Sequence, residues 1–181
     1  MNVFEILDHE HQLIGPALKV AQSCALRMGQ PGAAADPVGQ ELVGFCEKFV
    51  SQCHQVKEFN LYIRLLQKGR SYVIAPIASL HAEHRRLAPL TESLSAAGRL
   101  ATEGQPGAGE LVAGYLTDYA ALMETHILKE ERFYRVTDSI LGGSDHAELK
   151  ATFDRLDEAA LGADGHARYC QWVYQLAGAP G

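Results

Sequence analysis

The stretch H-Q-V-K-E at residues 54–58 recurs as H-I-L-K-E at residues 126–130. In each copy a histidine and a glutamate stand four positions apart, so on an α-helix they share one face. Apolar residues at helical spacing surround both copies, which turns that face toward a core. A buried glutamate is costly unless it is paired, protonated or bound to a metal. The two stretches therefore predict two core-forming helices that each carry a histidine and a carboxylate inward.

Helical periodicity continues through nearly the whole chain, and no segment has the pattern of a strand. We expect four long helices and then two short ones, over residues 3–28, 37–68, 76–98, 110–141, 145–161 and 167–176. Turns that contain glycine or proline separate the long helices, the first at residues 29–32. The predicted fold is all-α, an up-down-up-down four-helix bundle over residues 1–142 with a C-terminal helical extension over residues 143–181 packed on it.

The composition is that of a globular protein without nucleic-acid or membrane signals. Among 181 residues, 22 acidic side chains outnumber 16 basic ones and give a formal net charge of −6, and no segment gathers the basic residues. Nucleic acid is therefore not an expected partner. Residues 1–15 mix acids and histidines with apolar residues, unlike a signal peptide or a membrane span. We expect a cytoplasmic protein whose four cysteines, none of them in a C-x-x-C motif, are reduced thiols.

One histidine of each long helix falls on the apolar face of that helix, and two helices add a glutamate one turn further on. The residues are His11, His54, His84 and His126, with Glu58 and Glu130. A single inward histidine is usually a satisfied core residue. Four of them with two carboxylates, and with no Lys or Arg on the same faces to pair both, indicate a shared site. That site is either a metal centre or a metal-free network of His–Glu hydrogen bonds.

Other polar residues near these positions are expected to lie outside the core. Lys57 and Lys129 precede the two glutamates, and their long side chains should extend to solvent. Glu83 faces away from its neighbour His84 and is expected to be solvated. His166, at the start of the last helix, is interpreted as a surface or capping residue.

Residues 3–141 resemble the hemerythrin-like, or HHE cation-binding, proteins. The resemblance rests on four segments that are specific only together: E-H-Q-L-I at 10–14, C-H-Q-V-K-E at 53–58, A-E-H-R-R-L at 82–87 and H-I-L-K-E-E at 126–131. Ferritin-like di-iron bundles are the rival family. They need Glu-x-x-His on two helices, and the chain contains no such motif.

The resemblance implies a hemerythrin-like bundle around a centre of two iron ions, bridged by an oxide or hydroxide. The ligand positions of the family fall on His11, His54, Glu58, His84, His126 and Glu130. In the family the glutamates bridge the irons and the histidines cap them. Imidazole and carboxylate ligands suit iron, and they also accept manganese or zinc.

Two tyrosines mark a departure from the family pattern. Many bacterial members follow each His-x-x-x-Glu with Leu-Phe-Pro, whereas this chain has L-Y-I-R at 61–64 and F-Y-R-V at 133–136. Tyr62 and Tyr134 stand four residues after Glu58 and Glu130, on the same helix faces. They could hydrogen-bond a bridging carboxylate or supply electrons. The alternative is a pair of core aromatics whose hydroxyls reach backbone or water.

His81 leaves the number of histidine ligands open. Oxygen-carrying hemerythrins place two histidines one turn apart on the third helix, and here His81 and His84 are spaced by three. Two octahedral irons offer roughly twelve coordination positions, about half of them filled by two bridging carboxylates and a bridging oxygen. Five histidines would leave one position open, as a reversible O2 carrier needs, and four would leave two. We expect His84 alone to bind, because His81 lies at the edge of the apolar face.

The expected function is binding of, or reaction with, a small oxidant such as O2, peroxide or nitric oxide, in sensing or in a stress response. Carrier, sensor and redox enzyme stay open as roles. One alternative is an iron-handling protein, for instance in repair of iron–sulfur clusters. Another is a metal-free helical interaction module. The expected partner is a small diatomic or peroxide ligand, not nucleic acid or a membrane, and the sequence leaves the oligomeric state open.

Overall fold

The computed structural model describes residues 2–29, 36–176 and 178, and every regular element within them is helical. The elements in chain order are α1 (Val3–Met28), α2 (Pro37–Gly44), the π-helix η1 (Phe45–His54), α3 (Gln55–Gln67), the 3-10 turn η2 (Ser71–Val73), α4 (Ile74–Thr102), α5 (Ala108–Thr137), the 3-10 turn η3 (Asp138–Ile140), α6 (Gly143–Leu161) and α7 (Gly165–Leu176). The all-α prediction is confirmed. Residues 30–32 of the first predicted turn lie outside the described residues.

The first helix has the predicted bounds, and its start is fixed by a reciprocal cap. The Asn2 side chain accepts a hydrogen bond from the backbone N–H of Glu5 at 2.9 Å, and the Glu5 carboxylate accepts one from the backbone N–H of Asn2 at 2.7 Å. Two of the N–H groups that the first turn leaves without helical partners are thereby satisfied.

The prediction that the third helix ends near Gly98 is wrong, because α4 continues to Thr102. Gly98 serves packing and does not end the helix. A Cβ atom at Gly98 would lie 3.0 Å from Cγ1 of Val43, on the α2 helix that packs against α4. The fourth helix ends earlier than predicted, with α5 stopping at Thr137 and one 3-10 turn following it.

The second helix is continuous over the predicted range, but its middle is a π-helix, which the sequence pattern did not indicate. A π turn closes between residues i and i+5, so it holds more residues than an α turn. Residues four apart therefore lie closer to one line than they would on an α-helix. Two such rows are buried in η1, Phe45 with Phe49 and Cys53, and Cys46 with Val50 and His54. The π segment thus ends with the His54 side chain inside the core.

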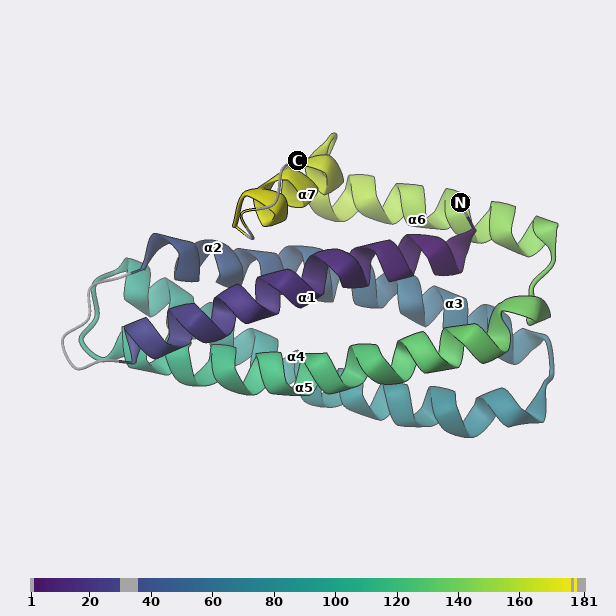
Figure 1. The fold of residues 1–181 in the computed structure, drawn as a ribbon, viewed down its shortest axis with the longest axis horizontal. Coiled ribbons are helices and arrows are strands. Elements are labelled where there is room, and N and C mark those ends of the chain that lie inside the picture. Colours follow the sequence, from purple (N-terminus) through teal and green to yellow (C-terminus); the bar gives the residue numbers. More distant parts are fainter. Residues whose placement is uncertain (1, 30–35, 177, 179–181) are drawn as a thin grey trace.

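The long helices lie side by side. Helix α1, the continuous α2–η1–α3 rod, α4 and α5 run lengthwise along the molecule (Figure 1). The two C-terminal helices, α6 and α7, pack against α1 and η1, and α6 also contacts α3.

The apolar core consists of two clusters with a polar layer between them. One cluster contains the α1 side chains from Leu13 onward, and the other contains those from Val3 to Leu7. The same division recurs on the other three rods, where apolar runs on either side belong to different clusters. On three rods the histidines and glutamates singled out in the sequence lie between the two runs, and on α5 Glu130 lies between them, with His126 beside Ile127 at the edge of one run. The fold therefore places them in a layer that apolar side chains close on both sides.

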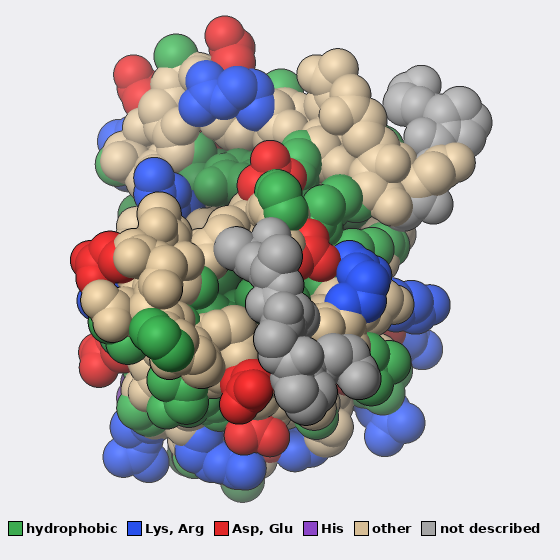
Figure 2. All heavy atoms as spheres, turned by 90° about the vertical axis from the view of Figure 1, so that its left-hand side faces the viewer, with side chains coloured by type: hydrophobic (Ala, Val, Ile, Leu, Met, Phe, Trp, Pro, Cys, Tyr) green, Lys and Arg blue, Asp and Glu red, His purple; other side chains and the backbone are tan. Residues whose placement is uncertain are grey.

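No helix in the described ranges combines the length and apolarity needed to cross a bilayer. At the end of the molecule that carries the α4–α5 connection, acidic and basic side chains are interspersed among apolar ones (Figure 2).

The packing role of Gly98 can be tested with a matched pair of valine substitutions. Gly98→Val should lower the free energy of unfolding by about 1–3 kcal/mol, because the new side chain collides with Val43 in a packed interface. Gly114→Val is the control, since Gly114 lies on the exposed face of α5 and its Cβ would meet nothing within 4 Å. The control should raise stability by roughly 0.5 kcal/mol through helix propensity. Equal effects of the two substitutions in urea denaturation would contradict the packing role.

Candidate metal centre

Six of the sequence-predicted residues converge between the four long rods. Two groups of potential ligands have their nitrogen and oxygen atoms within 4.8 Å of one another: His11, His54, Glu58 and Glu130 in the first group, and Glu58, His84, His126 and Glu130 in the second. Both glutamates belong to both groups. His11 lies on α1, His54 is the last residue of η1, and Glu58 stands in the first turn of α3. His84 lies on α4, and His126 and Glu130 lie on α5. The structure therefore brings one histidine per rod to the same pair of carboxylates.

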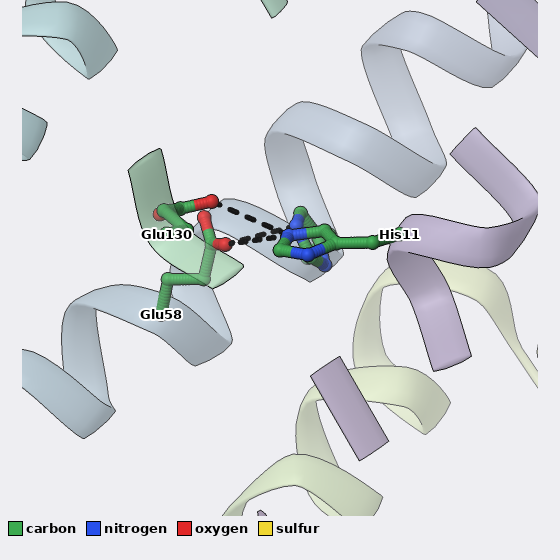
Figure 3. A group of neighbouring side chains, drawn as sticks. His11, Glu58 and Glu130 are labelled. Atoms are coloured by element: carbon green, nitrogen blue, oxygen red, sulfur yellow. Dashed lines mark ion pairs between the residues drawn. The ribbon is translucent and has the colours of Figure 1, made fainter. Parts of the chain in front are cut away.

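His11 lies between the two glutamates. Its Nε2 atom is 3.4 Å from Oε1 of Glu58 and 3.3 Å from Oε2 of Glu130, and all three side chains point to a common centre (Figure 3). His54 Nε2 lies 2.9 Å from Oε1 of Glu58, one helical turn away on the same rod. These contacts fill the first group.

The second group repeats this arrangement on the opposite side of the carboxylates. His126 Nε2 lies 3.1 Å from Oε1 of Glu130, one turn away on α5, and His84 Nε2 lies 3.2 Å from Oε2 of Glu58. The Nε2 atoms of His84 and His126 are 2.8 Å apart. A hydrogen bond between them needs a proton on one nitrogen and a lone pair on the other.

Several buried polar atoms at this centre lack a hydrogen-bond partner. They are Nδ1 and Nε2 of His11, Nε2 of His54, Oε2 of Glu58 and Oε2 of Glu130. Buried polar atoms are nearly always hydrogen-bonded, so a cluster of unsatisfied ones is evidence for a missing partner. Imidazole nitrogens and carboxylate oxygens are the donor set of first-row transition metals. The residues present therefore fit metal ions shared by the two glutamates.

The outer nitrogen of His54 is held by a carboxylate and a lysine. Nδ1 of His54 lies 2.8 Å from Oε2 of Glu10, and the other Glu10 oxygen accepts a hydrogen bond from Nζ of Lys57 at 2.5 Å. The Lys57 side chain is 0% exposed, so the expectation that it extends to solvent is wrong. The carboxylate fixes the imidazole with Nδ1 outward and Nε2 toward the centre.

His126 is held in the same way on the other side. Nδ1 of His126 lies 2.9 Å from Oε2 of Glu83, and Lys129 donates to the second Glu83 oxygen. The expectation that Glu83 is solvated is wrong, because its side chain is buried against His126. Lys129 does reach solvent, with 46% of its side chain exposed. The lysine of each His-x-x-Lys-Glu motif thus supports the histidine of the same motif through a glutamate from a neighbouring helix.

Sequence reasoning missed Glu10 and Glu83 as parts of the centre, although a signal for them was present. Each directly precedes an inward histidine, in the pairs Glu10-His11 and Glu83-His84. A glutamate one position from an inward residue lies about 100° round the helix, where it faces the neighbouring rod and not solvent. The repeated Glu-His pair beside a repeated His-x-x-Lys-Glu motif would have indicated both residues.

Tyr62 and Tyr134 each donate a hydrogen bond to the glutamate of the opposite rod. Tyr62 follows Glu58 on α3, yet its hydroxyl donates to Oε1 of Glu130. Tyr134 follows Glu130 on α5, and its hydroxyl donates to Oε1 of Glu58 at 2.9 Å. The two crossed hydrogen bonds fix the orientation of both carboxylates.

The structure does not bring His81 or His166 to the two glutamates. His81 is exposed on α4, with its ring 5.9 Å from that of Phe59. His166 is not a simple surface residue, because its Nε2 atom lies 3.2 Å from Oε1 of Glu10. It therefore contacts the support of His54 and not the centre itself.

A comparison with known families agrees with this donor set. Residues 2–135 match the family model described as the hemerythrin HHE cation-binding domain. The chain belongs to this hemerythrin HHE family. No curated protein and no solved structure gives a significant match. The match covers α1 to α5 nearly to its end and includes all six converging side chains.

In this hemerythrin-family protein the buried histidines retain protons when no metal is present. Burial by itself lowers the pKa of His11, but contacts with Glu130 and Glu58 outweigh it and raise the pKa to about 10. Burial likewise opposes the protonated form of His54 and of His126. Contacts with Glu58 and Glu10 nevertheless raise the pKa of His54 to about 9, and contacts with Glu130 and Glu58 raise that of His126 to about 9. Burial raises the pKa of Glu58, yet the charge on His54 and the close contact with His11 hold it well below the usual value. Metal binding must therefore displace protons from the histidines.

The stability of the metal-free protein should depend on pH in a defined direction. The three histidines have folded-state pKa values of about 9 to 10 against a usual value of 6.5, so their stabilisation is complete below pH 6.5 and disappears as pH rises through 9 to 10. We expect the melting temperature of metal-free protein to fall over this range. The metal-loaded protein should lack this fall, because metal replaces the protons. If calorimetry gave the metal-free protein a melting temperature that does not change with pH, the protonation assigned to these three histidines would be wrong.

Proposed function

We propose that the chain is a non-haem di-iron protein that binds or reacts with a small oxidant such as O2, peroxide or nitric oxide. The observation that carries the proposal is the sharing of Glu58 and Glu130 by two groups of ligands, each completed by two histidines. Two metal positions that share both carboxylates and have equal numbers of histidines form a dinuclear donor set. A single metal ion would leave one pair of histidines without a role.

The number of donors favours chemistry at an open site. His11 and His54 serve one position, and His84 and His126 serve the other. With both carboxylates bridging and one bridging oxygen, each octahedral ion would have roughly five ligands and one free place. A centre with a free place on each ion can bind a small ligand across both. His81 is exposed and belongs to neither group of ligands, which supports a count of four histidines over five.

The surrounding residues orient the ligands. Glu10 and Glu83 accept hydrogen bonds from Nδ1–H of His54 and His126, which leaves Nε2 of each to bind metal. The tyrosine hydroxyls hold the two carboxylates. The apolar clusters on either side limit the reaction to small molecules that can pass between packed side chains. Iron in this donor set supplies electrons by changing between the ferrous and ferric states.

The unsatisfied buried atoms distinguish this proposal from a metal-free interaction module. An internal network of His–Glu hydrogen bonds would satisfy its own members, whereas His11 has neither ring nitrogen hydrogen-bonded. A buried network with several unpaired atoms is less stable than an apolar core. We therefore favour a metal-binding role over a structural one.

We also propose a topology for the helical bundle and a cytoplasmic location for the protein. We infer an up-down-up-down bundle for residues 1–142 and a separate extension for residues 143–181, and the lengthwise packing of the four rods in Figure 1 supports this arrangement. Reduced cysteines and reversible iron chemistry both suit the cytoplasm. A small diatomic or peroxide ligand remains the proposed partner.

Removal of one histidine from either group should reduce iron binding. Reconstituted wild-type protein is expected to hold two irons per chain, and His54→Ala or His126→Ala should lose at least one, since each change removes a terminal ligand. His81→Ala is the control, because His81 is exposed and outside both groups. Iron counted per chain by atomic emission decides the outcome. Full occupancy in both ligand variants would defeat the assignment, and loss of iron from the control would make His81 a ligand.

The type of reaction can be read from the optical spectrum. Anaerobic ferrous protein is exposed to O2 and then evacuated, with iron counted before and after. Because we infer a free place on each ion, we expect a ferric spectrum that persists after evacuation. A visible band that appears with O2 and disappears on evacuation would instead indicate reversible binding. An unchanged ferrous spectrum would exclude reaction with O2 and direct the same test to peroxide and nitric oxide.

A further inference from the structure

Glu10 and Lys57, which hold the His54 ring in place, are covered by the two C-terminal helices, α6 and α7. Nζ of Lys57 lies 2.5 Å from Oε1 of Glu10 and 2.7 Å from Oδ1 of Asp157, which α6 supplies. The same Glu10 oxygen lies 3.2 Å from Nε2 of His166, which stands in the first turn of α7. Glu10 is thus held by His54, Lys57 and His166, and two of these contacts depend on the position of α6 or α7.

The cation that neutralises the carboxylates of Glu10 and Asp157 is the side-chain ammonium of Lys57. Glu10, Asp157 and His166 have atoms close enough to hold a metal ion, but the Lys57 ammonium contacts both carboxylates. Lys57 also lies over the ring of Phe153 on α6, 5.9 Å from its centroid. A fully buried lysine is stable only when its charge is paired, so this contact locks α6 to the rod that carries His54.

The support of His126 has no such cover. Within the described residues, Glu83 accepts hydrogen bonds from His126 and Lys129 and from no third side chain. The exposed fraction is 46% for the Lys129 side chain against 0% for that of Lys57. It is 11% for the His84 side chain against 1% for that of His11, while His54 and His126 are both fully buried. One half of the centre is therefore sealed by the extension, and the other half borders solvent.

We propose that α6 and α7 make the two metal positions unequal. By holding Glu10, the positioning residues Lys57, Asp157 and His166 keep metal at the His11/His54 position, while metal at the His84/His126 position exchanges readily. The inference rests on the proposed di-iron function. It assigns a role to a segment that begins after the matched family domain ends at residue 135.

The expected size of the effect follows from the way outer contacts act on ligands. Metal leaves the sealed position only when the His54 ring turns away, and that ring is fixed through Nδ1 by Glu10. Loss of a residue that orients a histidine ligand typically reduces metal affinity about 10–100-fold. Loosening the cover should therefore raise the release rate from the sealed position by a comparable factor and leave the other position unchanged.

Iron release to a coloured ferrous chelator tests the inference. Anaerobic ferrous wild-type protein, with iron counted first, is mixed with excess chelator and followed by absorbance. We expect two phases of equal amplitude, a fast one from the His84/His126 position and a slow one from the His11/His54 position. Asp157→Asn and, independently, His166→Gln should accelerate the slow phase about 10–100-fold and leave the fast phase unchanged. Lys129→Met, on the open half, should leave the slow phase unchanged.

Asp145→Asn is the matched control for a purely structural effect. Asp145 also lies on α6 and also joins it to α3, through Arg64 at 2.9 Å and Lys68 at 2.6 Å, but it has no contact with Glu10 or Lys57. This variant should lower the melting temperature without changing either release rate. Acceleration equal to that of Asp157→Asn would overturn the inference, as would a single release phase in wild type. Protein that holds no iron before chelation would overturn the proposed function as well, so the initial count separates the two failures.

Discussion

The structure depends on two carboxylates that have no access to water. Glu58 and Glu130 are fully buried between four helical rods, and a buried negative charge persists only when positive charge surrounds it. His11, His54 and His126 supply that charge as protons in the metal-free chain, and metal cations would replace those protons. This requirement explains the layered core, because a polar centre of this kind divides the apolar side chains into a cluster on either side. The two clusters then carry the hydrophobic stabilisation, and the centre decides how the rods are aligned.

The centre contains the same arrangement of sequence motifs twice. Helices α1 and α4 each contribute a Glu-His pair, and the α2–η1–α3 rod and α5 each contribute His-x-x-Lys-Glu followed by tyrosine four residues later. The glutamate of each pair supports the histidine of the adjacent motif. The tyrosines cross between the halves, so each shared carboxylate is held by a hydroxyl from the other half. The orientation of both carboxylates therefore rests on contacts that the supports Glu10 and Glu83 do not make.

Periodicity in the sequence identified the helices and the six converging side chains, because apolar spacing reports directly which face of a helix is buried. It misplaced Lys57, since whether a long side chain reaches solvent depends on what covers it, and α6 covers it from a hundred residues away in the sequence. The sequence wrongly predicts a helix end at Gly98, because a glycine needed for close packing and one that ends a helix look the same in a single sequence. The π segment was missed for a related reason. Its buried residues repeat every four positions, a spacing that an α-helical stripe also contains.

A site made by duplication of one motif would ordinarily have two equal halves. Here the six converging residues and their two glutamate supports are nearly symmetric, so a difference between the halves must come from outside them. The π-helix occurs only on the rod that carries His54 among the described elements, and the same rod receives α6. The chain that follows the matched family domain therefore contacts one half of the centre and not the supporting residues of the other. Because the two halves contain the same kinds of ligand, the packing of α6 over Lys57 is the feature by which the proposed centre would retain metal at one position and exchange it at the other.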